Sequence, residues 1–226
     1  MALARVQVQL APIGRLAATA AVNGQAWLTE AESRRLQGMR SQSRRDSFLA
    51  GHWQARKLAA RWLGVKAARI ALGNFADGRP AVQCDGKPVP LSLSLSHSGE
   101  WLALALGEVA VGIDVELPRR SRDLDALARS VFSPADQHRL QAMAAEERAP
   151  AFFELWALHE VRGKRSGEGM QPGTSRTFRL QSCGRESAQG LSWRFRGGAV
   201  ALATTPGMPV EFIGESPGEP AYWRYT

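Results

Sequence analysis

The segment FELWALHEVRGK, residues 153–164, followed by GEGM at 167–170, carries the strongest signal for the fold of this chain. On a helix, Trp156, Glu160 and Lys164 recur every four residues and share one face. Upstream, VGIDVE at 111–116 alternates like a strand, on which Asp114 and Glu116 point the same way. Together the two segments offer three carboxylates and one ammonium, a set that suits a divalent cation and a phosphate.

Length and composition indicate a globular protein. The chain has 226 residues and a hydrophobic fraction of 44%, enough for one domain or two small ones with a sizeable core. Its two cysteines form no CxxC pair and no disulfide framework, so we expect a cytoplasmic protein. Alternating hydrophobic residues at 6–10 predict a strand rather than a signal peptide, and no apolar run is long enough to cross a membrane. We therefore expect no membrane partner.

The net charge of +8 indicates a polyanionic partner, which could be a nucleic acid, a phosphate-rich cofactor or an acidic protein. Charge alone does not separate these from a surface of dispersed, solvated arginines. Aromatic residues do not interleave with the arginines as a stacking platform, and no nucleic-acid-binding motif is present. We therefore expect no nucleic acid partner.

Hydrophobic periodicity predicts two similar runs of strands and helices. Helices are expected over 27–40, 46–63, from about 123, from 134 and over 151–166; strands are expected over 6–10, 70–75, 81–83, 91–96, 101–106, 109–115, 177–180, 191–195, 199–203 and 210–213. The Trp, Lys, Arg and Gly at 53, 57, 61 and 64 have the spacing of the Trp, Glu, Lys and Gly at 156, 160, 164 and 167. We predict an α+β, sandwich-like fold with subdomains 1–108 and 109–226 in a pseudo-twofold arrangement and a ligand cleft at their junction.

The carboxylates have two readings. Asp114 or Glu116 could cap a turn while Glu160 pairs with Lys164 on a solvated helix face. Alternatively, the three acids could form a half-open cage for Mg²⁺, completed by water and phosphate oxygens. Asp114 ends a nearly apolar run, where an unpaired carboxylate would be costly. This favours a metal site.

A second candidate lies at 95–99, where His97 stands between Ser96 and Ser98 in an expected tight turn at 97–100. Such a histidine could donate to a phosphate together with backbone N–H groups, although a lone histidine in a turn is more often structural. Arginines flank the two N-terminal helices, and Arg79 follows Gly78 in a turn. Guanidinium groups bind phosphates bidentately.

In this order the motifs resemble the larger, two-subdomain 4'-phosphopantetheinyl transferases, often called the surfactin type. The family has a Gly-Ile-Asp-x-Glu block, matched at 112–116, and a Trp-x-x-Lys-Glu-x-x-x-x-Lys block running into Gly-x-Gly-Leu, matched at 156–164 and 167–170. A Ser-His-Ser/Gln-Gly turn is matched at 96–99, and a Gly-Lys/Arg-Pro turn at 78–80, with Gly86-Lys87-Pro88 as a rival match. The resemblance spans most of residues 25–170.

The resemblance implies transfer of the 4'-phosphopantetheine arm of coenzyme A to a serine of an apo acyl or peptidyl carrier protein, with Mg²⁺ and release of 3',5'-ADP. It implies a metal site of Asp114, Glu116 and Glu160, and a catalytic set of Glu160, Lys164 and Asp114, in which Glu160 is the base. The coenzyme A contacts that it implies are Arg35, Arg79, Ser96, His97, Asp114 and Lys164. It also implies a monomer, and it leaves open whether the carrier serves fatty acid, polyketide or nonribosomal peptide synthesis.

The chain departs from the family pattern at His159, which stands where lysine is usual. An imidazole with a pKa of about 6.5 is mostly neutral at pH 7, so activity could be weaker or peak at lower pH. From the sequence we predict that His159→Lys retains or raises activity. The alternative is a catalytically weakened member that binds coenzyme A or a carrier protein without efficient transfer. Gly163, a poor helix former, leaves the placing of Lys164 in doubt.

Overall fold

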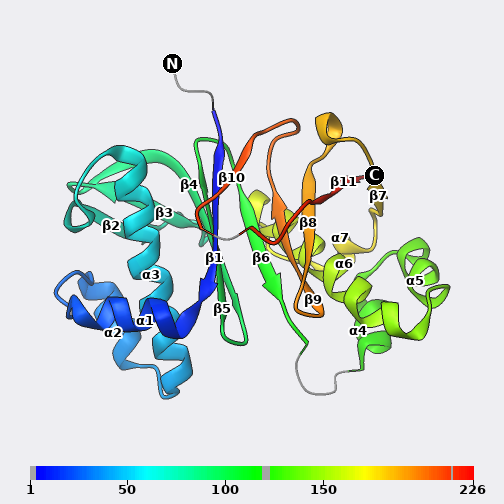
Figure 1. Cartoon of the computed structure of the whole chain (residues 1–226), viewed down its shortest axis with the longest axis horizontal. Coiled ribbons are helices and arrows are strands. Elements are labelled where there is room, and N and C mark those ends of the chain that lie inside the picture. Colours follow the sequence, from blue (N-terminus) through cyan, green and yellow to red (C-terminus); the bar gives the residue numbers. More distant parts are fainter. Residues whose placement is uncertain (1–3, 119–122, 215) are drawn as a thin grey trace.

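The computed structural model of the protein describes residues 4–118, 123–214 and 216–226. Two sheets stand side by side in the middle of the molecule, with helices on their outer faces (Figure 1). The first sheet has the strand order β10-β1-β5-β4-β3-β2, and the second has the order β6-β9-β8-β11-β7.

The first sheet contains β1 (Val6–Pro12), β2 (Ile70–Asn74), β3 (Pro80–Cys84), β4 (Lys87–Ser98), β5 (Trp101–Gly107) and β10 (Val210–Phe212). The second contains β6 (Gly112–Glu116), β7 (Leu180–Ser182), β8 (Gly190–Phe195), β9 (Gly198–Ala203) and β11 (Ala221–Tyr225). The N-terminal helices are α1 (Ile13–Val22), α2 (Glu30–Gln37), α3 (Gln42–Leu63) and the short η1 (Ala67–Arg69). The C-terminal helices are α4 (Leu124–Val131), α5 (Pro134–Gln141), α6 (Ala145–Ser166), α7 (Pro172–Ser175) and the short η2 (Arg185–Ser187).

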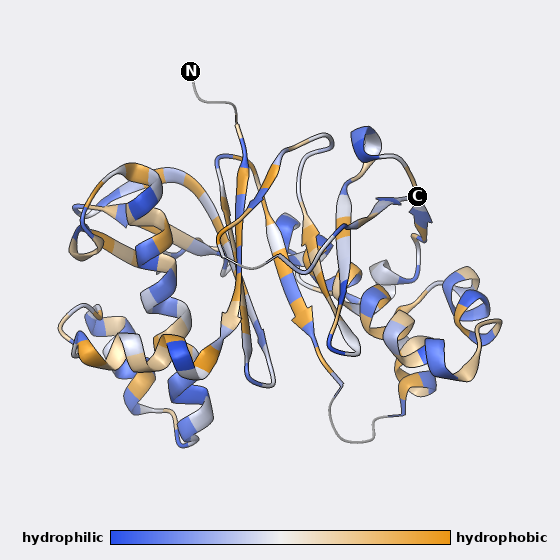
Figure 2. Cartoon of the chain, viewed as in Figure 1, coloured by the Kyte–Doolittle hydropathy of each residue, from blue (hydrophilic) through white to orange (hydrophobic). Residues whose placement is uncertain are grey.

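Three hydrophobic clusters define four layers. One cluster joins α1 and α3 to the first sheet, a second joins α6 to the second sheet, and a third lies between the two sheets. In the third cluster Val8 of β1 and Ile113 of β6 are fully buried. Hydrophobic residues are accordingly concentrated on the central strands (Figure 2). The order helix, sheet, sheet, helix confirms the predicted α+β sandwich.

The two halves repeat one plan. In the first half β1 pairs with β5 and β5 pairs with β4; in the second, β6 pairs with β9 and β9 pairs with β8, all antiparallel. Helices α3 and α6 have 22 residues each and end at left-handed C-cap glycines, Gly64 and Gly167. The repeated Trp and Gly spacing in the sequence falls on these two helices in register. The predicted pair of similar halves is confirmed.

Serine side chains join the two sheets. Along β4 the sequence LSLSLSHS directs leucines toward α3 and serines toward β6. Three of these serines accept hydrogen bonds from backbone N–H groups of the 111–117 segment: Ser92 from Val111, Ser94 from Ile113 and Ser98 from Leu117, at 3.0–3.1 Å. The backbone of β6 is therefore satisfied by hydroxyls where another strand would otherwise have to pair with it.

Several boundaries differ from the sequence predictions. The turn expected at 97–100 is wrong, because β4 continues to Ser98 and only Gly99 and Glu100 turn. Helix α6 begins at Ala145 rather than 151, because Pro150 is accommodated near its N-terminal end. The alanine-rich α1 and the strand β11 were not predicted. Within the described residues, no helix has both the length and the apolar character needed to span a bilayer.

Candidate active site

Three elements converge on the carboxylate of Asp114. It lies in the middle of β6, with Ser96 of β4 on one side and Lys164 of α6 on the other. The Ser96 hydroxyl donates to Asp114 Oδ1 at 2.7 Å, and Lys164 Nζ donates to the same oxygen at 2.6 Å. Lys164 Nζ also donates to the carbonyl of Ile113 at 3.2 Å. Residues 96, 114 and 164 are far apart in the sequence, and the fold brings them into direct contact.

The second carboxylate oxygen of Asp114 is buried and has no hydrogen-bond partner within the described residues. Asp114 itself is 3% exposed. A buried oxygen carrying negative charge is costly when it lacks a partner. Hard cations such as Mg²⁺ take carboxylate oxygens as ligands. The free oxygen of Asp114 is therefore suited to bind a metal ion.

Glu160 lies one helical turn before Lys164 and is half-buried. Burial raises the pKa of Glu160, the nearby Asp114 carboxylate raises it further, and the Lys164 ammonium acts in the opposite direction. The fold therefore gathers two carboxylates and one ammonium within electrostatic reach of one another. A site that concentrates negative charge in this way favours an added cation.

Glu116, two residues after Asp114 on β6, shares its face of the strand and is half-buried. Across residues 4–118, 123–214 and 216–226, no three His, Cys, Asp or Glu side chains are grouped closely enough to hold a metal ion. A cage of three carboxylates would require the side chains of Glu116 and Glu160 to turn toward Asp114. The oxygen donor set itself is the one that Mg²⁺ prefers.

Glycines allow helix α6 to approach its neighbours closely. A Cβ on Gly112 would lie 2.1 Å from the carbonyl oxygen of Val161, so β6 and α6 are in backbone contact there. A Cβ on Gly163 would lie 2.3 Å from the carbonyl oxygen of Gly169, because the chain after α6 folds back on the helix. The Gly163 carbonyl accepts from the amides of Gly167 and Gly169. Gly163 is therefore required by packing, and the helix runs unbroken through Lys164.

The structure places Arg79 against the C-terminal end of α6. Its Nη1 donates to the carbonyl of Arg165 at 3.2 Å, and its guanidinium forms an ion pair with Asp77 at 2.7 Å. The rival residue Lys87 is exposed at the first position of β4. It stands nine residues from Ser96, about 30 Å along an extended strand. Of the two basic turns, the one that carries Arg79 is beside the Asp114 cluster.

His97 and Arg35 lie on another side of the first sheet. His97 follows Ser96 on β4, so its exposed side chain points to the face that α3 covers. Arg35 is exposed on α2, with its guanidinium 5.6 Å from the centre of the Phe48 ring of α3. Helix α2 is fastened to α3 by the buried pair of Glu32 and Arg56, whose charged atoms are 2.6 Å apart. The residues predicted for the nucleotide thus fall into two groups: Ser96 and Arg79, which contact Asp114 and the end of α6, and His97 and Arg35, which do not.

His159 does not face the Asp114 cluster. It is 2% exposed and is stacked between Phe132 and Phe178, at ring distances of 5.2 and 4.8 Å. Neither ring nitrogen has a hydrogen-bond partner in the part of the chain that the structure describes. Burial, with a smaller contribution from the positive charge of Arg162, lowers the pKa of His159 to about 4. The imidazole is therefore neutral at physiological pH, which argues against a lower pH optimum set by this residue.

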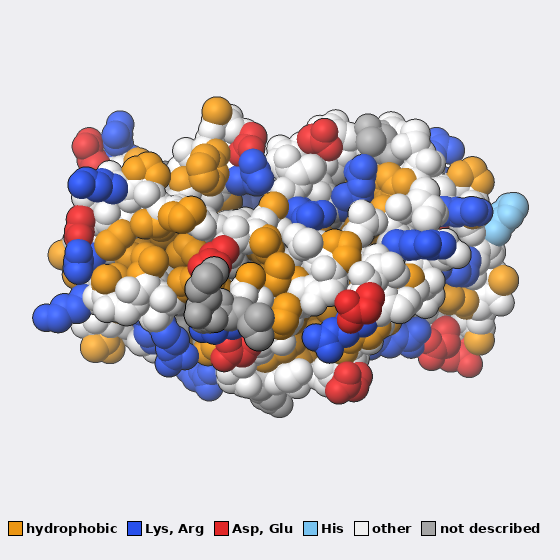
Figure 3. Space-filling view, turned by 90° about the horizontal axis from the view of Figure 1, so that it is seen from above, with side chains coloured by type: hydrophobic (Ala, Val, Ile, Leu, Met, Phe, Trp, Pro, Cys, Tyr) orange, Lys and Arg blue, Asp and Glu red, His pale blue; other side chains and the backbone are white. Residues whose placement is uncertain are grey.

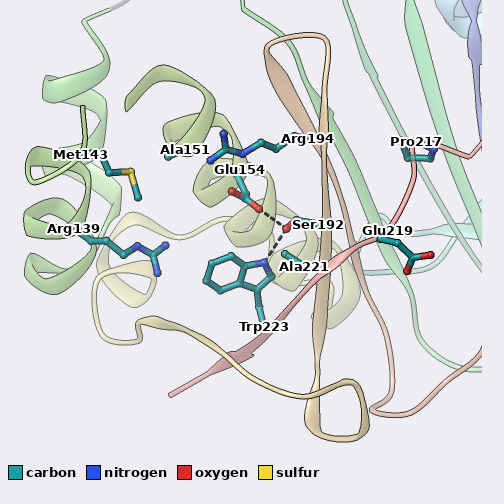
Figure 4. A pocket seen from close by; sticks show the side chains of 10 residues that line it. All are labelled: Arg139, Met143, Ala151, Glu154, Ser192, Arg194, Pro217, Glu219, Ala221 and Trp223. Atoms are coloured by element: carbon teal, nitrogen blue, oxygen red, sulfur yellow. Dashed lines mark hydrogen bonds between the residues drawn. The ribbon is translucent and has the colours of Figure 1, made fainter. Parts of the chain in front are cut away.

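A well-formed cavity lies away from this cluster. It has a volume of about 540 Å³ between α5, the N-terminal part of α6 and strands β8 and β11 (Figure 4). At its floor Trp223 Nε1 donates to Ser192 Oγ at 2.8 Å, and that hydroxyl donates to Glu154 at 2.6 Å. The guanidinium of Arg139 lies over the Trp223 ring. None of the predicted site residues lines this cavity.

Basic side chains are dispersed on the face seen from above. There, Lys and Arg alternate with acidic, hydrophobic and neutral groups and form no continuous track (Figure 3). Several of the described arginines are paired with carboxylates, including Arg5 with Glu211 and Arg69 with Asp85. The net charge is therefore spread over this surface.

Comparison with known proteins relates the chain to one superfamily. The family model described as the 4'-phosphopantetheinyl transferase superfamily matches residues 110–203. A curated 4'-phosphopantetheinyl transferase from Bacillus subtilis is 30% identical over 143 residues, which are 62% of this chain and 61% of that protein. The 4'-phosphopantetheinyl transferase HetI from Nostoc sp. (strain PCC 7120) is 28% identical over 127 residues, 56% of this chain and 54% of its own length.

The chain spans about half to three fifths of the length of these curated relatives. The crystal structure of a holo-(acyl-carrier-protein) synthase from Bacillus anthracis in complex with CoA (3',5'-ADP) aligns with 46% of this chain and 93% of its own, at 21% identity and a TM-score of 0.37. A score this low supports no structural argument, so the fold assignment rests on the elements described above. The matched range 110–203 contains Asp114, Glu116, Glu160 and Lys164.

Proposed function

We propose that this chain is a member of the 4'-phosphopantetheinyl transferase superfamily, whose model matches residues 110–203, and that it transfers the phosphopantetheine arm of coenzyme A to a serine of an apo carrier protein. The products are the holo-carrier and 3',5'-ADP. The observation that carries the proposal is the Asp114 cluster, in which a buried carboxylate contacts Ser96 and Lys164 and keeps one oxygen without a partner. This cluster lies within the matched range except for Ser96.

We assign the metal site to Asp114, Glu116 and Glu160. The unpartnered oxygen of Asp114 and the clustering of negative charge around Glu160 support Mg²⁺ as the ion. When bound, Mg²⁺ would neutralise charge on the pyrophosphate of coenzyme A and act as a Lewis acid. Phosphoryl transfer depends mainly on such positioning and charge neutralisation.

The protein side chains then have separate tasks. Glu160 takes the proton of the carrier serine, a task favoured by its raised pKa and by its half-buried position. Lys164 holds the pyrophosphate, toward which its ammonium can move from Asp114. Asp114 orients both groups. The serine oxygen attacks the β-phosphorus, and 3',5'-ADP leaves with the negative charge that basic residues neutralise.

The nucleotide end is assigned to Arg35, Arg79, Ser96 and His97. Arg79 is supported over Lys87 by its contact with the C-terminal end of α6. We propose that residues 1–108 form the subdomain on the nucleotide side and that residues 109–226 form the subdomain that holds the metal and the catalytic residues. Coenzyme A and an acyl or peptidyl carrier protein are the proposed partners. We also propose a monomer that works in the cytoplasm, where the free cysteines Cys84 and Cys183 stay reduced.

The decisive experiment incubates the purified chain with coenzyme A, Mg²⁺ and a panel of apo-carriers from fatty acid, polyketide and nonribosomal peptide synthesis. We expect mass spectrometry to show the gain of one phosphopantetheine arm on at least one carrier, and no gain after chelation of Mg²⁺. The Glu160→Ala protein is the matched control. Binding of coenzyme A without any transfer would instead support a catalytically weakened family member.

A further inference from the structure

The tip of the β2–β3 hairpin reaches from the N-terminal half of the chain to the C-terminal end of α6. Residues 75–79 form a compact turn, in which the Phe75 amide donates to the Arg79 carbonyl at 2.9 Å and the Gly78 amide donates to the Phe75 carbonyl at 3.0 Å. The guanidinium of Arg79 lies over the Phe75 ring, 5.9 Å from its centre. These hydrogen bonds hold the turn together and so position Arg79 against α6.

Asp77 orients this guanidinium. Its Oδ1 accepts from the backbone amide of Arg79 at 3.0 Å, and its Oδ2 accepts from Arg79 Nε at 2.8 Å and pairs with Nη2 at 2.7 Å. These contacts leave Nη1 free to donate to the carbonyl of Arg165. That carbonyl belongs to the last turn of α6, where backbone oxygens lack helical partners and a positive charge is favoured.

The ion pair rests directly on Gly167, the C-cap of α6. Gly167 has a left-handed φ of +83°, and a Cβ there would lie 2.7 Å from Asp77 Oδ2 and 3.0 Å from Arg79 Nε. Only a glycine therefore lets the pair approach this closely. Gly167 follows Lys164 by three residues, so the contact sits beside the lysine that reaches Asp114.

We propose that Asp77 is a positioning residue, which locks Arg79 across the junction of the two halves and so fixes the last turn of α6 with Lys164. Asp77 does not touch the reacting groups in this assignment, because a carboxylate would repel the phosphates of the substrate. The effect of Asp77 on the affinity for coenzyme A rests on the proposed function, because it assumes that Lys164 and Arg79 bind the anionic nucleotide. The competing possibility is that Asp77 stabilises only its own turn.

The test compares Asp77→Asn with Asp85→Asn. Asp85 is a matched control, because it is another exposed aspartate at an end of β3 and pairs with Arg69. Its side-chain hydrogen bonds are to Arg69 and Cys84, which both lie in the N-terminal half. Asparagine keeps the shape at both positions and tolerates the positive φ of Asp85, 50°. Both pairs are exposed, so both variants should fold, which circular dichroism and thermal melting check.

The first measurement, hydrogen exchange, does not depend on transferase activity. Hydrogen exchange reports local opening of backbone amides, so we expect Asp77→Asn to speed exchange of the Gly167 and Gly169 amides roughly two- to five-fold, the range for an exposed ion pair. Asp85→Asn should leave these amides unchanged. Faster exchange confined to residues 75–79 would overturn the proposal, because it would show a role within the turn alone.

The second measurement is kinetic. We expect Asp77→Asn to raise KM for coenzyme A by the same roughly two- to five-fold factor with little change in kcat, and Asp77→Glu to restore part of the loss. An unchanged or lower KM would overturn the positioning role, since it would mean that Asp77 only competes with the substrate for Arg79. If the unmodified protein transfers nothing to any carrier, the proposed function fails and the exchange result still decides the structural claim.

Discussion

Lys164 Nζ lies 2.6 Å from Asp114 Oδ1, so the ammonium of α6 neutralises one oxygen of a carboxylate that is 3% exposed on β6. The same ammonium belongs to the group proposed to hold the pyrophosphate. In the protein without substrate it stabilises Asp114; with substrate it would be shared with phosphate oxygens. The pair of Lys164 and Asp114 therefore affects both the stability of the protein and the proposed reaction, and each effect can be measured.

Replacing Lys164 by methionine should cost both stability and activity. Asp114 would be left buried without its cationic partner, which we expect to lower the free energy of unfolding by about 2 kcal/mol, measured by urea denaturation. Carrier modification should fall strongly. Lys57→Met is the control, since Lys57 is exposed on α3 and should change neither quantity. Equal effects at 57 and 164 would argue against the pair.

Replacing Glu160 by glutamine should separate stability from function. The side chain keeps its shape but loses a charge that burial and Asp114 disfavour. We therefore expect a higher melting temperature without divalent cation at pH 7, together with loss of transfer. Asp114→Ala should also abolish transfer. Robust carrier modification by Glu160→Gln or Glu160→Ala would contradict the proposed base.

Replacing Ser94 by alanine should weaken the junction of the sheets. The Ser94 hydroxyl accepts the buried amide of Ile113 at 3.0 Å, and its loss leaves that donor without a partner. We expect a loss of about 1–3 kcal/mol in the free energy of unfolding. Ser130→Ala on α4 removes an exposed serine whose hydroxyl donates to the Leu127 carbonyl of its own helix and should stay within about 0.5 kcal/mol. A similar loss at both serines would show that the bridging bond has no special weight.

Acid should destabilise the N-terminal half through Glu32. His52, Arg56 and the Thr29 amide, which bond its carboxylate, lower the pKa of Glu32 to about 2 although burial alone would raise it. A depressed pKa means that the stabilisation is complete above the ordinary value of 4.5 and is lost as the pH falls toward 2, with a total of about 3 kcal/mol. Glu32→Gln should be less stable at pH 7 and should flatten the acid limb of a stability profile. An unchanged acid limb would argue against this pair.

Replacing His159 by lysine should destabilise the protein, a cost that the sequence prediction of retained or raised activity did not consider. The ring is buried between Phe132 and Phe178, so a lysine would bring an ammonium into an aromatic stack at a cost of more than about 2 kcal/mol. His159→Leu should be close to neutral, because it removes ring nitrogens that lack partners. Thermal melts of the two variants decide the point, and higher stability of the lysine variant would contradict the burial argument.

The sequence predicts the helices and strands around the site well, because its signals there are local. Thr29 and Glu32 form a capping box at the start of α2, Ser133 caps α5, and Gly64 ends α3. The spacing in α6 likewise predicts that Glu160 and Lys164 share one face. Contacts across the chain were beyond such reasoning.

The serines of β4 that bond to the 111–117 segment, and the contact of Asp77 with Gly167, show why the sequence does not predict such contacts. Alternating leucines and serines predict β4, but nothing local indicates that the serines bond to β6 instead of water. From the sequence, Gly163 is expected to weaken the helix. The structure shows instead that a side chain at this position would collide with the Gly169 carbonyl. The burial of His159 similarly depends on Phe132 and Phe178, which come from other segments. These features are set by tertiary packing, which overrides residue preferences.

The two long helices have equal lengths and matching glycine caps, but they differ where chemistry would matter, because α3 carries Lys57 at the position where α6 carries Glu160. In a dimer of identical subunits every substitution appears twice. Here both helices belong to one chain, so a carboxylate can be kept in one helix and an ammonium group in the other. The internal repeat thus gives the molecule two helices of equal length with opposite charge at this position, and each helix can change independently of the other.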